Sequence, residues 1–401
     1  MSRQLPLYQW ADTVASRFPT LSASQAFVLA LYSFGMVLAH SCGLSAVALQ
    51  LAPLLLTSDN TVRQRLREFY KPKDKKAGKQ RQELDPSGCF SALLNWVLSA
   101  WTCRRVALAL DVTNLAAKFH VLCVSVLYKG CAIPVAWKIL RANTQEAWHP
   151  HWVHLLQRLH TTLGKGWQVL VLTDRGLESS RLFMAITTLG WHPLMRAKAY
   201  GTFRPKGWRK FYALGKFAPC VGAVFVAVGT AYKTSDARLC CTLLASWSRG
   251  HDEAWLLLTD LPPAAADPCW YAFRAWIEQG FKVLKRAGWQ WQRTRMTDPA
   301  RAERLWLAVA VATLWLLAVG GVAEEAVPLE VVPALPEGVE RPRRHGPRLH
   351  RVFRRGLSEI VAALLQGRLP HGQFVPEAWP ENFHEATNMS EAEFCSKQTY
   401  P

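Results

Sequence analysis

The chain has 401 residues, half of them hydrophobic, so it can bury a large core and is not an intrinsically disordered chain. Its 48 Lys and Arg residues exceed its 29 Asp and Glu residues, giving a formal net charge of +19. This excess favours a polyanionic partner, nucleic acid before an anionic membrane surface. The length predicts two or three domains.

The positive charge is clustered along the chain. Residues 61–81 carry nine Lys or Arg against two acids, residues 198–216 carry six and no acid, and residues 341–355 carry seven Arg and no acid. One such run is usually a solvated surface, but three in one chain favour nucleic-acid binding. The ten cysteines form no CxxC pair, which indicates buried thiols in a reducing compartment, and no signal peptide is visible.

Residues 1–100 predict a helical domain. Ser22 is a candidate N-cap for a first apolar helix, and a second follows over 44–55. A short polar turn then precedes an Arg-rich helix over 61–70, with Ser58 or Asp59 as its N-cap. This outline fits a helix-turn-helix DNA reader, and also many other helical hairpins. The candidate DNA contacts are Arg63, Arg65 and Arg67, followed by a basic linker.

From residue 101 the pattern becomes α/β. Three apolar strands, a helix over 145–163, a strand ending at Asp174, a helix over 178–189 and a strand over 191–197 outline a ribonuclease-H-like core. We expect this core to comprise 101–200 and 263–325, interrupted by a β-rich insertion over 201–262. The remainder, 326–401, is a basic, Pro-rich C-terminal segment with one amphipathic helix near 357–367.

One segment, 305–323, is long and apolar enough to span a bilayer. The competing interpretation is a fully buried core helix, which we favour because charged residues precede it directly and no second span of similar purity follows. We therefore expect no membrane association.

Four polar residues near position 280 form the most informative pattern. Arg274, Glu278 and Lys285 follow Tyr271 by three, seven and fourteen residues. On an α-helix these offsets fall within an arc of about 60°. One acid among two cations and a phenol suits a metal bound to a phosphate.

Two further acids complete this set. We expect Asp111 and Asp174 each to end an apolar strand, and reactive groups collect at the carboxyl ends of strands in α/β sheets. Either Asp alone is more often a turn or helix cap. Together with Glu278, they predict a site for Mg²⁺, a pair of which can promote in-line displacement at phosphorus.

This set of residues resembles the DDE transposases of bacterial insertion sequences, of the IS-four type that includes the Tn-five and Tn-ten transposases. The resemblance rests on Asp, Asp and Glu in this order, on the LTDRG sequence around Asp174, and on the Tyr-x2-Arg-x3-Glu-x6-Lys motif from Tyr271. It covers about 104–325 well and 1–100 more loosely.

The resemblance implies cut-and-paste transposition: hydrolysis at the element ends through hairpins, then strand transfer into target DNA. Asp111, Asp174 and Glu278 would be the catalytic, metal-binding triad, with two Mg²⁺ per site or Mn²⁺ as a substitute. Tyr271, Arg274 and Lys285 would hold end phosphates, and Arg175 would touch the DNA backbone. Trp247 or Trp255 would stack on a flipped base.

The implied partners are double-stranded DNA, as terminal inverted repeats and target, and a second copy of the chain in a homodimer on paired ends. The implied location is the bacterial cytoplasm, with the nucleoid. Two alternatives remain open: a catalytically silent DNA-binding protein derived from a transposase, and a ribonuclease-H-like nuclease without strand transfer. His149, His151 and His154 cluster without a further ligand and predict a helix surface.

Overall fold

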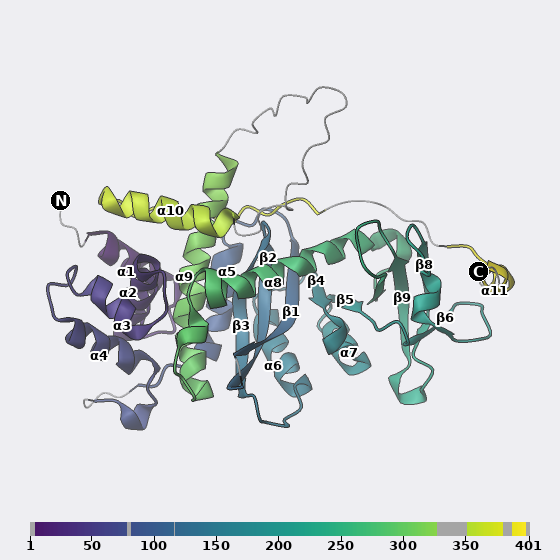
Figure 1. The fold of residues 1–401 in the computed structure, drawn as a ribbon, viewed down its shortest axis with the longest axis horizontal. Helices are drawn as coiled ribbons and strands as arrows, with labels where there is room; N and C mark the ends of the chain where they lie inside the picture. The colour runs from purple at the N-terminus through teal and green to yellow at the C-terminus, as the bar shows by residue number, and fades with distance from the viewer. Residues whose placement is uncertain (1–4, 78–81, 116, 327–350, 380–386, 398–401) are drawn as a thin grey trace.

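A computed structural model describes residues 5–77, 82–115, 117–326, 351–379 and 387–397. The fold is mixed α/β, with ten strands in one sheet in the order β3-β2-β1-β4-β5-β10-β9-β8-β6-β7. The sheet runs along the molecule, with the N-terminal helices beyond one end and β6 and α11 at the other (Figure 1).

The N-terminal region is helical, as predicted. Its helices are α1 (Leu5–Arg17), α2 (Ala23–Ala39), α3 (Leu44–Leu51) and α4 (Asp59–Tyr70). Ser22 and Gln25 form a reciprocal capping box that satisfies backbone donors at the start of α2. The Ser58 hydroxyl accepts a hydrogen bond from the Thr61 amide and caps α4. Both predicted N-caps are therefore confirmed.

A helix, α5 (Phe90–Leu98), leads into an antiparallel meander of β1 (Arg105–Leu115), β2 (Phe119–Tyr128) and β3 (Cys131–Arg141). Lys129 and Gly130 join β2 to β3 with φ of 42° and 74°. Positive φ at both central residues is the turn geometry whose twist matches that of the flanking strands. The meander thus has a tight, well-defined connection.

Two parallel strands extend the meander. α6 (His149–His160) leads to β4 (Gln168–Thr173), and α7 (Ser180–Thr188) leads to β5 (His192–Arg196). β4 pairs in parallel with β1, and β5 in parallel with β4. The carboxyl ends of β1, β4 and β5 consequently meet at one edge of the sheet, which we call the C-terminal edge.

Residues 201–262 supply five strands: β6 (Thr202–Pro205), β7 (Tyr212–Ala213), β8 (Val224–Ala231), β9 (Leu239–Ser246) and β10 (Trp255–Thr259). β10 pairs antiparallel with β5, and Leu257 lies opposite Arg196. These strands therefore continue the same sheet. The short helix α11 (Glu391–Lys397) packs on them, with Phe394 among the rings of Trp208, Phe217 and Phe225.

The segment that carries Tyr271 to Lys285 is helical but is not one α-helix. It starts as a 3₁₀ helix, η7 (Pro268–Arg274), continues as α8 (Ala275–Lys282) and ends in a π-helical turn, η8 (Val283–Ala287). α8 crosses in front of β1–β3, while α6 lies behind them (Figure 1). Gly280 permits this close packing, because a Cβ there would lie 2.9 Å from the Ala132 Cβ.

The long helix α9 (Pro299–Glu325) contains the apolar segment and packs against α2, α4 and β3. It is long and apolar enough to cross a membrane, and 94% of its most apolar window is buried inside the protein. A core helix passes the same length and composition test. The predicted amphipathic helix is α10 (Arg351–Leu365), which begins earlier than expected and packs on α9. The part of the third basic run before residue 351 lies outside the described residues.

Candidate active site

Strand register places Asp111 and Asp174 side by side. The last pair of the parallel β1–β4 ladder is Leu110 with Thr173, so the two aspartates are the next residues of adjacent strands. β1 itself continues to Leu115 in its pairing with β2. The prediction that Asp111 ends its strand is therefore wrong: it ends only the parallel ladder, because β2 extends further than β4.

The two carboxylates share one cation. Asp111 Oδ1 accepts a hydrogen bond from the Val112 amide, and Asp174 Oδ1 accepts one from the Arg175 amide, each at 2.7 Å. Their Oδ2 atoms both face Arg274, whose Nη2 lies 2.8 Å from Asp111 Oδ2 and 3.8 Å from Asp174 Oδ2. Arg274 is 7% exposed, so this guanidinium is buried beside both acids.

Glu278 lies within electrostatic reach of this pair. Burial raises the pKa of Asp111 above its ordinary value; Arg274 opposes this rise, and the negative charges of Asp174 and Glu278 add to it. Glu278 itself is exposed in the first turn of α8. Within the described residues, no three acidic, His or Cys side chains are grouped closely enough to hold a metal. The three acids are thus neighbours whose side chains do not converge on one point.

The donor chemistry nevertheless fits a hard divalent cation. The Oδ2 atoms of Asp111 and Asp174 both face the Arg274 guanidinium, and their Oδ1 atoms accept hydrogen bonds from backbone amides. Carboxylate oxygens are the ligands that Mg²⁺ prefers, and it retains water and phosphate oxygens as its other ligands. Glu278 is a third carboxylate within electrostatic reach of Asp111.

Tyr271 is buried behind the aspartates rather than exposed toward a ligand. Its side chain is 4% exposed, and its hydroxyl donates a hydrogen bond of 3.3 Å to the Thr173 carbonyl. Burial, followed by the charge of Asp174, raises its pKa well above the ordinary value. The tighter 3₁₀ geometry of η7 brings residues three apart to the same side, so Tyr271 and Arg274 both reach the C-terminal edge. Tyr271 therefore anchors η7 to β4.

A second ion-pair group lies beside this centre. Glu253, from the loop between β9 and β10, pairs with Arg175 and with Arg196, each at 2.8 Å. Arg175 follows Asp174 directly, and Arg196 ends β5. Sequence reasoning singled out Arg175 and missed Glu253 and Arg196, because only the β5–β10 pairing brings the inserted strands to this edge.

The two candidate tryptophans differ in their surroundings. The Trp255 ring packs edge-on against Tyr271, with ring centroids 5.4 Å apart, so it lies next to the aspartate pair. The Trp247 indole nitrogen donates a hydrogen bond to the His251 carbonyl within its own loop. Both are partly exposed.

The remaining predicted residues lie elsewhere. Lys285 is partly exposed on η8. The three α4 arginines are exposed on the N-terminal helices: Arg63, Arg65 and Arg67. His151 pairs with the exposed Glu146 at the start of α6, which agrees with a helix-start surface for the histidine cluster.

A comparison with known protein families matches part of the chain. Residues 139–315 match the family model of the transposase DDE domain. The match contains Asp174 and Glu278 and begins after Asp111. It supports a DDE transposase.

No curated protein matches the chain. Among solved structures, the chain is similar to the cryo-EM structure of a piggyBac transposase synaptic complex with hairpin DNA. The identity is 11% and the TM-score 0.40, over 98% of this chain and 86% of that one.

Proposed function

We propose that the chain is a cut-and-paste DNA transposase whose catalytic acids are Asp111, Asp174 and Glu278. The observation that carries the proposal is the aspartate pair that follows the last residue pair of the parallel β1–β4 ladder. This pair shares one buried cation and lies within electrostatic reach of Glu278. The match of residues 139–315 to the transposase DDE domain supports it independently.

Within the DDE transposases, we assign the chain to the IS-four type and its central domain to the ribonuclease-H-like fold. The strand order β3-β2-β1-β4-β5, antiparallel in its first two pairings and parallel in its last two, supports such a core. The domain division proposed is a helical DNA-binding region over 1–100, a core over 101–200 and 263–325, an insertion over 201–262 and a C-terminal segment over 326–401.

In the reaction, the chain's own groups would position the scissile phosphate and the acids. Backbone amides of Val112 and Arg175 orient the two aspartates, and Tyr271 fixes η7 against β4 so that Arg274 stays at the edge. Asp111, Asp174 and Glu278 would hold the divalent metal. When bound, two Mg²⁺ ions, or Mn²⁺, would activate the attacking water or 3′-hydroxyl and stabilise the leaving oxygen.

Arg274 and Lys285 would contact end phosphates. A guanidinium that lies beside the aspartates can instead make a forked contact to a phosphate held at the same place. Trp255 is the better placed of the two tryptophans for a flipped base, because it lies against Tyr271. The partners would be element ends and target DNA bound by a homodimer, in the bacterial cytoplasm with the nucleoid.

The product pattern tests this function. Purified protein is incubated with labelled duplexes carrying the inverted repeats that flank the reading frame, with target plasmid and Mg²⁺. A transposase yields cleaved ends and joined products; hairpins at the ends would support the hairpin route. Cleaved ends without joined products would indicate a nuclease, and binding without cleavage would indicate a silent DNA-binding protein.

A further inference from the structure

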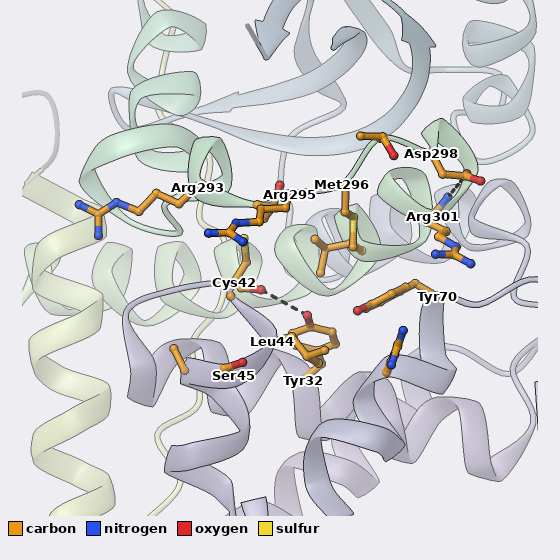
Figure 2. Close-up of a pocket in the computed structure, with 16 residues that line it drawn as sticks. Tyr32, Cys42, Leu44, Ser45, Tyr70, Arg293, Arg295, Met296, Asp298 and Arg301 are labelled. Carbon is orange, nitrogen blue, oxygen red and sulfur yellow. Dashed lines mark hydrogen bonds between the residues drawn. The ribbon is translucent and has the colours of Figure 1, made fainter. Parts of the chain in front are cut away.

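A cleft separates the N-terminal helices from the segment that leads into α9. It has a volume of about 500 Å³. One wall is formed by α2, the α2–α3 turn, the start of α3 (Leu44–Leu51) and α4, and the other by residues 293–301 with Leu305. In Figure 2, Tyr32, Leu44 and Tyr70 lie on the lower wall, and Arg295, Met296 and Asp298 lie on the upper wall. We call this the junction cleft.

The junction cleft is strongly cationic. Four arginines line it: Arg67, Arg293, Arg295 and Arg301. Its one lining acid, Asp298, accepts a hydrogen bond of 3.0 Å from the Arg301 amide and caps α9. Within the part of the chain that the structure describes, none of the four arginines forms an ion pair with a carboxylate. The charge is therefore uncompensated inside the protein.

Polar atoms in the cleft also lack partners. Arg301 Nε is buried without a hydrogen-bond acceptor. Arg67, Arg293 and Arg295 are exposed, and Arg293 donates to the neutral side-chain oxygen of Gln290. A buried donor without a protein acceptor can be satisfied by a water molecule or by an anion in the cleft.

The two walls are fixed relative to each other. The Cys42 amide donates a hydrogen bond of 2.8 Å to the Trp289 carbonyl, which joins the α2–α3 turn to the segment before η9 (Trp291–Arg293). Arg304 of α9 is buried and donates to the carbonyls of Tyr70 and Leu84, each at 3.1 Å, and to the Glu83 carboxylate. These hydrogen bonds of Cys42 and Arg304 fix the position of one wall of the cleft relative to the other.

The shape favours a long anion over a single phosphate. A second hollow, of about 580 Å³, shares Leu44, Ser45 and Arg67 with the junction cleft and continues along α4 to Arg63. Arg63 and Arg67 are one helical turn apart, about 6 Å along α4. A groove with arginines along its length and on both walls suits a polymer with regularly spaced charges.

We propose that the junction cleft binds the phosphodiester backbone of duplex DNA and couples the N-terminal helices to the catalytic segment. This inference rests on the proposed function for its choice of polymer. The arginines of the cleft would contact the sugar-phosphate backbone of the DNA. Such contacts position a duplex without reading its base sequence. Arg293, Arg295 and Arg301 thereby become DNA-contacting residues together with Arg63 and Arg67.

The test uses the full-length chain carrying Glu278→Gln, with EDTA, so that no cleavage chemistry is needed. Fluorescence anisotropy measures binding of a duplex of arbitrary sequence across a series of salt concentrations. Arg67→Ala and Arg295→Ala, on opposite walls, should each weaken binding about five- to tenfold and reduce the salt slope by about one. The matched control is Arg17→Ala, which removes an exposed arginine at the end of α1, outside both hollows.

Unchanged salt slopes for both cleft variants, or an equal loss of affinity for Arg17→Ala, would overturn the inference. A second measurement needs no variant: phenylglyoxal modification of arginines, read by mass spectrometry. Duplex DNA should protect Arg67 and Arg295. Protection by sodium tripolyphosphate but not by duplex would indicate a small-anion site instead. Cleft-dependent binding by a chain that never cuts DNA would contradict the proposed function and leave the cleft assignment standing.

Discussion

The Arg274 guanidinium lies 2.8 Å from the Asp111 carboxylate and also faces Asp174. Because Asp111 is largely buried, this cation offsets a charge that would otherwise be costly. It lies on the Oδ2 side of both carboxylates. We therefore expect Arg274 to be the internal counterion of the acids until metal and DNA phosphate arrive.

Removal of this counterion should destabilise the fold. Arg274→Gln is expected to lower the free energy of unfolding by about 2–3 kcal/mol, less than for a fully buried pair because Asp174 is half exposed. Urea denaturation in EDTA at neutral pH measures the loss. Adding Asp111→Asn to this variant should restore part of the stability, because it removes the uncompensated charge. Strictly additive effects of the two substitutions would contradict the counterion role.

Glu253 should restrain DNA binding at the C-terminal edge of the sheet. It neutralises Arg175 and Arg196, and the exposed pair with Arg175 adds little to stability. Glu253→Gln is therefore expected to raise affinity for duplex DNA several-fold and to steepen its salt dependence, with little change in melting temperature. Anisotropy titrations provide the measurement. Unchanged or weaker binding would show that neither arginine reaches the DNA.

Cys42 should be chemically inert in the folded protein. Its side chain is 1% exposed, and burial raises the pKa of its thiol from 9.0 to about 12. At pH 8 this shift lowers the thiolate fraction about a thousandfold, and the thiolate is the reactive form. Iodoacetamide should label the exposed Cys220 and Cys240 well before Cys42. Peptide mass spectrometry measures the labelling, and equal rates would contradict the described packing of the α2–α3 turn.

The contact between α9 and α10 should depend on glycine. A Cβ on Gly356 would overlap the Leu316 carbonyl oxygen. Gly356→Val is expected to cost about 2–3 kcal/mol and to make residues 351–365 sensitive to protease. Thermal unfolding and limited proteolysis measure both effects. Gly164→Ala is the control, since nothing lies within 4 Å of its added Cβ. Equal behaviour of the two variants would refute this contact.

Local signals in the sequence predicted much of the fold. The starts of α2 and α4 are predictable because Ser22 and Ser58 are good N-cap residues. The order of strands and helices from 105 to 196 is predictable from hydrophobic periodicity. The aspartates were found because each follows an apolar run. These features depend on a few neighbouring residues, so a single sequence suffices to predict them.

The remaining features depend on contacts between distant segments. The pairing of Leu257 with Arg196 joins the inserted strands to the main sheet, and nothing in either strand's own pattern specifies that register. The ion pair of Arg274 with Asp111 depends on a 3₁₀ segment that an α-helical projection cannot represent. The junction cleft likewise combines Arg67 with Arg295, which come together only when α4 packs against α9.

Single-turnover cleavage of a labelled element-end duplex in Mg²⁺ tests the catalytic assignment most directly. Glu278→Gln is predicted to reduce cleavage by at least about a thousandfold, while DNA affinity stays within twofold of the unaltered chain. Asp236→Asn, an exposed acid between β8 and β9 at the opposite edge of the sheet, should cleave at the unaltered rate. Full cleavage by Glu278→Gln would contradict the assignment of Asp111, Asp174 and Glu278 as the catalytic acids.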